Sequence, residues 1–169
     1  MVFGLMLIMR GRPADLLVGK MNVFKQRISL LREQMAGLGL DAYIVPSADP
    51  HLSEYLPEHW QARTWLSGFD GSAGTLLVSA QFAGLWTDSR YWEQALAQLE
   101  GSEIALMRQG QDGVPDLNDW LCSQLQAGMT VGADGFTLSM RAAHDLQAAL
   151  EGVSLRFSWN EKLLDNIWP

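Results

Sequence analysis

The side chains that could do chemistry in this chain lie mainly between positions 49 and 91. Asp49, His51 and Glu54 stand within six residues of one another and supply the oxygen and imidazole ligands that divalent metal ions accept. Their spacing matches no recognised ligand motif, and the surrounding segment is rich in proline. We therefore expect Asp49 and Ser53 to cap turns, His51 to hydrogen-bond to backbone, and this chain to hold no metal ion.

A second candidate is the serine of Gly71-Ser72-Ala73-Gly74, which resembles the nucleophile elbow of serine hydrolases. That motif needs a glycine two residues before the serine, and Asp70 stands there instead. The same glycines make a poor phosphate cradle, because no lysine accompanies them and the segment leads into a strand. A structural turn is the favoured interpretation, and a hydrolase that uses Ser72 is the alternative.

Tryptophan is abundant, with seven in 169 residues, and two arginines flank its densest cluster. A guanidinium beside aromatic rings, such as Arg63 or Arg90, can bind a carboxylate or a peptide carbonyl through its planar donors. It can equally pair with a nearby acid such as Asp88 or Glu93. The residue types leave both interpretations open. The cluster itself consists of Trp60, Trp65, Trp86 and Trp92.

Composition limits the class of protein around these candidates. The chain has 48% hydrophobic and 18% charged residues, which is typical of a globular domain and not of a disordered one. The net charge of −7 disfavours nucleic-acid binding, because such a surface repels phosphate. The single cysteine, Cys122, excludes a disulfide framework and is expected to be an inert core residue.

Helical and strand patterns alternate along the chain, which predicts an α/β fold with one mixed β-sheet flanked by helices on both faces. The two strands between residues 75 and 87 should be antiparallel because only a tight turn joins them. Ser89 is the expected cap of the helix that follows. The expected helices cover residues 22–37, 90–99, 115–126 and 139–150, and the expected strands cover 42–45, 75–79, 84–87, 104–107, 130–132 and 153–157.

The first nine residues, MVFGLMLIM, are apolar and are followed by basic residues, the reverse of a secretory signal. Nine apolar residues are too few to span a bilayer, so we expect no membrane association and a cytoplasmic location. Residues 1–20 are interpreted as an N-terminal extension: an added strand or helix, or the product of a start codon placed too early, with Met21 the true start.

Four blocks of sequence, in this order, resemble the N-terminal, creatinase-like domain of Xaa-Pro aminopeptidases (aminopeptidase P), and most closely the long, three-domain cytosolic type. The resemblance covers residue 22 to the end and makes 21–160 the domain and 161–169 the start of a linker to a missing downstream domain. The blocks are Tyr43-Ile-Val-Pro-Ser-Ala-Asp49, His51-x-Ser53-Glu54-Tyr55, Ser67-Gly-Phe-Asp-Gly-Ser-Ala-Gly-Thr75 and Trp86-Thr-Asp-Ser-Arg-Tyr91, with Leu163-Leu-Asp-Asn-Ile-Trp168 similar to the family's interdomain link.

The resemblance implies an enzyme that removes the N-terminal residue preceding proline. Its C-terminal pita-bread domain would hold two divalent metal ions, with manganese the expected metal. This chain would then hold no catalytic residue and be inactive alone. It would form one wall of the substrate cleft, help to bind proline-containing peptides, and contribute to contacts in a homo-oligomer. The alternative is a stand-alone interaction or dimerisation module of a homologue that has lost its activity.

One residue carries over to a ligand role. The arginine of the Trp-Thr-Asp-x-Arg-Tyr block contacts the bound peptide in the long-type enzymes, and that position is Arg90 here. Asp88 is a weaker candidate, expected to orient Arg90. Trp92, where phenylalanine is usual in the family, is a weaker candidate that could narrow the cleft, and Ser89 replaces a glycine frequent in relatives.

Overall fold

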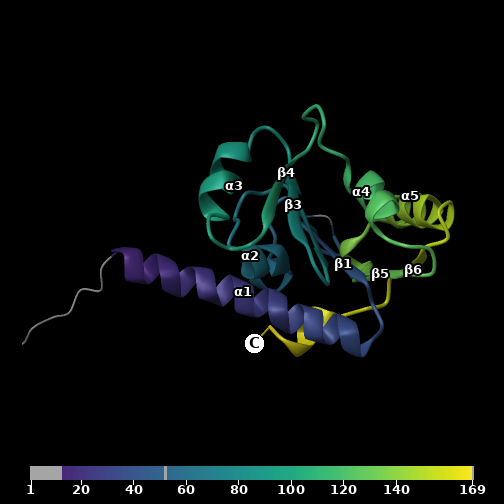
Figure 1. Ribbon diagram of the computed structural model, residues 1–169, viewed down its shortest axis with the longest axis horizontal. Helices are drawn as coiled ribbons and strands as arrows, with labels where there is room; N and C mark the ends of the chain where they lie inside the picture. The colour runs from purple at the N-terminus through teal and green to yellow at the C-terminus, as the bar shows by residue number, and fades with distance from the viewer. Residues whose placement is uncertain (1–12, 52, 169) are drawn as a thin grey trace, which may run out of the picture.

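The computed structural model describes residues 13–51 and 53–168, which form three layers: helices, a six-stranded sheet, and helices again (Figure 1). The strand order is β4-β3-β2-β1-β5-β6. The β1–β2 and β2–β3 pairs are antiparallel and the other three are parallel, so the predicted mixed sheet in an α/β fold is confirmed.

The strands are β1 (Ala42–Pro46), β2 (Thr75–Ser79), β3 (Ala83–Thr87), β4 (Ala105–Arg108), β5 (Thr130–Ala133) and β6 (Arg156–Ser158). The α-helices are α1 (Pro13–Gly37), α2 (Ala62–Ser67), α3 (Trp92–Gln98), α4 (Leu117–Gln124) and α5 (Met140–Glu151). Three short 3-10 helices complete the described chain: η1 (Glu58–Trp60), η2 (Gly135–Thr137) and η3 (Leu163–Asn166).

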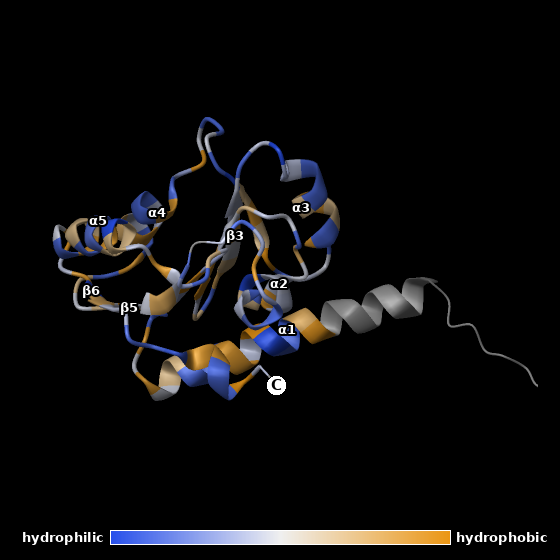
Figure 2. Cartoon of the chain, turned by 180° about the vertical axis from the view of Figure 1, so that it is seen from behind, coloured by the Kyte–Doolittle hydropathy of each residue, from blue (hydrophilic) through white to orange (hydrophobic). Residues whose placement is uncertain are grey.

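Each face of the sheet has its own core, because successive strand residues point to opposite faces. Tyr43 and Val45 of β1 pack with α1, α2, α3 and η3, whereas Ile44 packs with α4 and α5. Leu76 and Leu77 of β2 divide in the same way, and both are fully buried. In Figure 2 the strands are mostly hydrophobic, and helices α3 and α5 carry hydrophilic residues on their outer sides.

The helix at the N-terminus is longer than predicted. It begins at Pro13 rather than at residue 22, with proline at a first-turn position where its missing N–H costs no helical hydrogen bond. Residues 13–20 of the predicted extension are therefore helical in the structure, and residues 1–12 lie outside the described range. No helix in the described part of the chain combines the length and apolarity needed to cross a bilayer.

Two local predictions were wrong, and one helix was not anticipated. Helix α2 was not predicted, because six residues, Ala62–Ser67, are too few to show a helical period. Ser89 does not cap α3; Tyr91 occupies the cap position, without a side-chain hydrogen bond to the helix. Strand β6 begins at Arg156 rather than at residue 153, because Ser154 adopts a positive φ of 61° that interrupts extended backbone.

The segment after residue 160 packs against the domain. The hydroxyl of Tyr43 donates to the Glu161 carbonyl at 2.5 Å, and Leu163 is 1% exposed in the core formed with α1. Trp168 stacks on Trp65 with ring centroids 5.7 Å apart. The stretch expected to start a linker is thus held on the same face of the sheet as α1 and α2.

Candidate functional site

Arg90 lies in the turn between β3 and α3, where the sequence placed a ligand-binding guanidinium. Its Nε donates to Asp88 Oδ1 and its Nη2 to Asp88 Oδ2, both at 2.8 Å, so the pair is bidentate. The backbone N–H of Arg90 also donates to Asp88 Oδ1, at 3.0 Å. Asp88 therefore occupies one edge of the Arg90 guanidinium.

The pair changes the acidity of both groups. The Arg90 guanidinium, by its side-chain hydrogen bonds, lowers the pKa of Asp88 to about 2, and the Asp88 carboxylate raises the pKa of Arg90 above its ordinary value. Both side chains stay charged over the whole physiological range. Because the Arg90 side chain is 69% exposed, its outer edge is accessible to a carbonyl or carboxylate from a ligand.

Trp92 stands beside this pair at the start of α3. Its indole Nε1 donates to the Thr87 carbonyl at 3.0 Å, which fixes the ring against the end of β3. The Arg108 guanidinium lies over the same ring, 5.7 Å from its centroid. The sequence did not single out Arg108, because only the parallel pairing of β3 and β4 in the folded sheet places Arg108 opposite Thr87.

The Gly71–Ser72 segment forms a turn before β2 and is hydrogen-bonded to Tyr91, the neighbour of Arg90. The hydroxyl oxygens of Ser72 and Tyr91 lie 2.6 Å apart and are hydrogen-bonded. No histidine accompanies Ser72 in the contacts described, and its only side-chain hydrogen bond there is to this tyrosine. The serine thus lacks the paired base that nucleophilic catalysis requires, which favours the structural interpretation of this motif.

Arg63 differs sharply from Arg90, although both flank the same tryptophans. It is 4% exposed and donates to the carbonyls of Phe69 (3.2 Å) and Gly71, while the Phe69 ring lies 4.7 Å from its guanidinium carbon. Burial lowers the pKa of Arg63 to about 10, so it remains protonated at neutral pH. Arg63 therefore organises a loop and is not placed to meet a ligand from solvent.

The predicted turn at Asp49 is confirmed, and its carboxylate is occupied by backbone. Asp49 Oδ1 accepts the N–H groups of His51 and Ser53, each at 2.9 Å, and these bonds, chiefly the one from Ser53, lower the pKa of Asp49. Asp49 is 2% exposed. These residues do not fit a metal centre, and within the described range no group of three His, Cys, Asp or Glu side chains could hold a metal ion.

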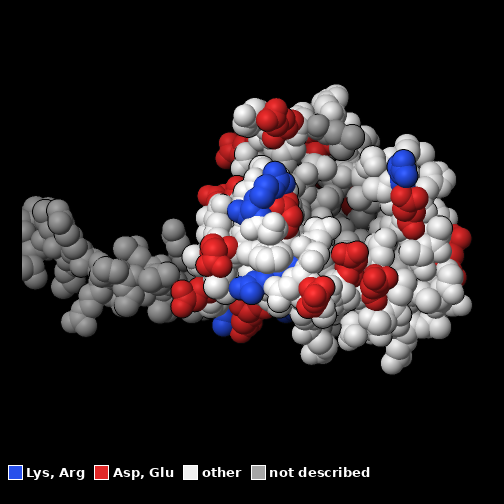
Figure 3. Space-filling view, turned by 90° about the horizontal axis from the view of Figure 1, so that it is seen from above, with Lys and Arg blue, Asp and Glu red and all other residues white. Residues whose placement is uncertain are grey.

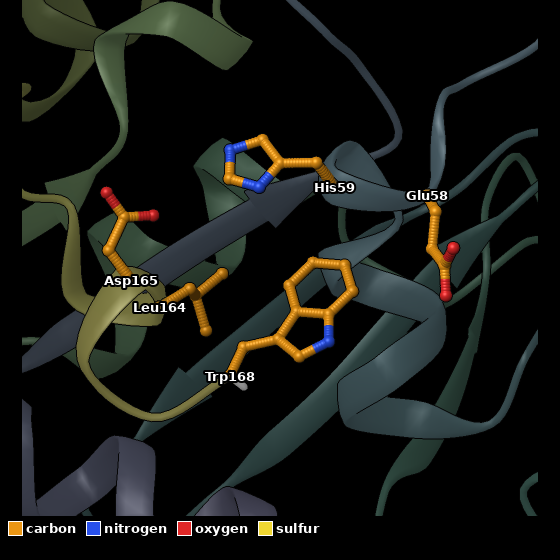
Figure 4. A pocket seen from close by; sticks show the side chains of 5 residues that line it. All are labelled: Glu58, His59, Leu164, Asp165 and Trp168. Carbon is orange, nitrogen blue, oxygen red and sulfur yellow. The ribbon is translucent and has the colours of Figure 1, made fainter.

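A separate pocket of about 510 Å3 opens beside the C-terminal segment. Figure 4 shows the rings of His59 and Trp168 between the carboxylates of Asp165 and Glu58, with Leu164 at the wall. The two rings are stacked, with centroids 6.5 Å apart and planes 8° from parallel. No sequence pattern indicated this pocket, because residues 59 and 168 meet only in the folded chain.

Charged side chains of both signs lie on the face of the molecule seen from above. On the face in Figure 3, acidic side chains are distributed widely and basic ones form only small separate spots. This face has no extended basic patch of the kind that binds a nucleic-acid backbone.

Comparison with known proteins places the chain in a family. Residues 27–158 match the family model of the Creatinase/Prolidase N-terminal domain. Aminopeptidase P2 of Arabidopsis thaliana is 42% identical over 150 residues, which are 86% of this chain and 21% of that protein. Human Xaa-Pro aminopeptidase 2 is 38% identical over 143 residues, 83% of this chain and 21% of that protein. The chain thus spans about a fifth of the length of these curated relatives.

Solved structures agree in fold. An X-prolyl aminopeptidase from Caenorhabditis elegans, described as a cytosolic enzyme with a di-nuclear active site, superposes with a TM-score of 0.80 at 32% identity, over 86% of this chain and 25% of that one. The N-terminal domain of cytoplasmic peptidase PepQ from Mycobacterium tuberculosis H37Rv superposes with a TM-score of 0.60 at 28% identity, over 83% of this chain and 97% of that one. With its fold and most of its length matched, this chain belongs to the Creatinase/Prolidase N-terminal domain family.

Proposed function

We propose that this chain is the non-catalytic N-terminal domain of a cytoplasmic, metal-dependent Xaa-Pro aminopeptidase, which removes the N-terminal residue preceding proline. The observation that carries the proposal is the 38–42% identity to Xaa-Pro aminopeptidases across more than four-fifths of the chain. These relatives are about three to four times as long as this chain. The downstream domain would supply two divalent metal ions, manganese for preference, that polarise the scissile carbonyl and activate water.

Within that enzyme, this domain would wall the cleft and hold the peptide through Arg90. Asp88 occupies one edge of the guanidinium, and the other edge is exposed to solvent. This exposed edge supports the role, because its N–H groups can donate to a peptide. A preset guanidinium can donate to a peptide carbonyl or carboxylate with little further loss of side-chain freedom. Trp92, fixed beside it, would restrict the width of the cleft at this edge.

The test is the hydrolysis of Xaa-Pro tripeptides with added manganese by the full-length protein that contains this chain. We expect Arg90→Ala to lower kcat/KM by about 10- to 100-fold, the value of one lost charge-assisted hydrogen bond, with metal content unchanged. Arg141→Ala is the matched control, because Arg141 is 93% exposed on α5. Kinetics unaltered by Arg90→Ala would remove Arg90 from the peptide site, and hydrolysis by the isolated chain would refute the non-catalytic assignment.

A second candidate, an interaction or dimerisation module, is favoured by one surface feature. Phe136 and Trp159 are 53% and 44% exposed on neighbouring backbone, where the Gly135 N–H donates to the Trp159 carbonyl at 2.7 Å. Exposed aromatic side chains are enriched at interfaces between subunits. Analytical ultracentrifugation of the wild-type chain should then show a homo-oligomer, and the Phe136→Ser variant should be a monomer. A wild-type chain that is itself a monomer would count against this candidate.

A further inference from the structure

The ion pair with Asp88 does not by itself fix Arg90 in space. Both partners belong to one exposed turn, and their side chains are 69% and 36% exposed. Exposed pairs of this kind contribute little, because solvent screens them and ordering two side chains costs entropy. A second support is needed for the guanidinium to face a ligand in a constant position.

Tyr91 provides that support. The Arg90 guanidinium carbon lies over the Tyr91 ring, 5.3 Å from its centroid, a favourable distance for a cation–π contact. The ring is held at both ends: its hydroxyl bonds to Ser72 at 2.6 Å, and it meets Phe69 edge to face at 6.0 Å. Arg90 therefore rests on a ring that two residues of a distant loop hold in place.

The loop approaches that ring so closely that only glycine fits at position 71. A Cβ added to Gly71 would lie 2.3 Å from Phe69 Cζ and 2.8 Å from Tyr91 Cδ1, distances that real Cβ atoms do not show. The backbone of the Gly-Ser motif is therefore a packing surface for Tyr91, and any side chain at 71 would displace the ring.

Arg63 fixes the loop from its other side. Its guanidinium donates to the carbonyls of Phe69 and Gly71, and the Phe69 ring packs over it. Burying a charged group in this way is costly, and the two hydrogen bonds from Nη1 and Nη2 to carbonyls of one loop offset part of that cost, while the buried Nε has no partner among the described residues. The buried arginine thus holds the residues on which Tyr91 packs.

We propose that Tyr91 is a positioning residue for Arg90, and that Arg63 and the Gly71–Ser72 turn hold Tyr91 in place. The chain of contacts runs from α2 through the loop before β2 to the turn before α3. Through these contacts, Arg63 and the Gly71–Ser72 turn share one role, which is to hold the Arg90 guanidinium in position. The expected effect of Tyr91 on peptide hydrolysis rests on the proposed function, whereas its effect on the position of the Arg90 side chain does not.

The first experiment measures Arg90 directly in this chain. In ¹⁵N–¹H spectra, the Arg90 Nε–H, bonded to Asp88, should exchange slowly with water in the wild type. Tyr91→Leu should speed that exchange about tenfold or more, and Tyr91→Phe, which keeps the ring, should speed it less. Tyr55→Leu, at an 83% exposed tyrosine, is the matched control and should change nothing. An Arg90 signal unaffected by Tyr91→Leu would overturn the proposal.

The second experiment is a double-mutant cycle in the full-length enzyme. Tyr91→Leu should lower kcat/KM about 3- to 10-fold, mainly through KM, and should have no further effect when Arg90 is already alanine. An equal loss with and without Arg90 would mean that Tyr91 acts by general stability, and the positioning role would fail. If the wild-type enzyme cleaves no Xaa-Pro peptide, the proposed function fails, and the exchange measurement still decides the role of Tyr91.

Discussion

At the scale of the residue, the two arginines show how burial decides the role of one side-chain type. Arg63 and Arg90 both lie next to aromatic rings, yet one is 4% exposed and the other has a 69% exposed side chain. The buried guanidinium uses its donors on backbone carbonyls, whereas the exposed one pairs with a carboxylate and keeps an open edge. The chemistry available to each follows from what its neighbours have already occupied.

The Asp88–Arg90 pair predicts a specific pH dependence. The pKa of Asp88 is about 2 in the folded chain, against about 3.9 for an ordinary aspartate, because Arg90 donates to the ionised form. Its stabilisation is therefore fully present above pH 4 and is lost as the pH falls through about 2. A ¹³C titration of the Asp88 carboxyl should give that low midpoint, and Arg90→Gln should raise it toward 4. An unchanged midpoint in Arg90→Gln would contradict the pairing.

At the scale of the element, two serines with similar sequence contexts behave differently at helix starts. Ser139 Oγ accepts the Ala142 N–H at 3.1 Å and caps α5, as the position before a helix predicts. Ser89 lies three residues before α3 and makes no such bond, because the Asp88–Arg90 turn delays the helix to Trp92. The arrangement that presents Arg90 thus displaces the helix start.

This difference can be measured as stability. Ser139→Ala should lower the free energy of unfolding by about 1 kcal/mol, because it leaves an N–H at the helix start without its partner. Ser89→Ala should change it by less than about 0.5 kcal/mol. Urea denaturation of both variants makes the comparison, with Ser139→Asp as the variant that should keep the cap. Equal losses at the two serines would show that the caps are assigned wrongly.

Strand β2, near the centre of the sheet, carries apolar side chains into the cores on both faces. The Leu77 side chain of β2 is fully buried on the face of the sheet that α4 and α5 cover. Leu77→Ala should therefore lower the free energy of unfolding by about 2–5 kcal/mol. Leu96, on α3 and 52% exposed, is the matched control, and Leu96→Ala should cost less than about 0.5 kcal/mol. A small loss at Leu77, seen in urea denaturation, would contradict the placement of this core.

At the scale of the whole molecule, the C-terminal segment belongs to the folded unit. Tyr43 and Leu163 join the centre of the sheet to residues 161–168, and Trp168 lines the pocket with His59. Because the hydrogen bond of the Tyr43 hydroxyl and the burial of Leu163 both involve this segment, we expect the folded unit to extend past residue 160.

Shortening the chain tests this extension. A chain ending at Asn160 should lose at least as much stability as Leu163→Ala, for which we expect about 2–4 kcal/mol, because Leu163 is 1% exposed. Asn166→Ala, at an exposed position of η3, is the control and should be nearly neutral. Urea denaturation that shows full stability for the shortened chain would place the segment outside the folded unit.

The α/β class, the antiparallel pair at residues 75–87 and the turn at Asp49 were determined by the sequence alone. Each depends on spacing or side-chain type within a few neighbouring residues, which a local pattern records. The start of α3, the burial of Arg63, the support of Arg90 by Tyr91 and Ser72, and the pocket between His59 and Trp168 were decided only by the tertiary structure. These features join residues that are distant in sequence, or depend on which hydrogen-bonding groups neighbouring residues already use. They arise only when the helices pack on the sheet.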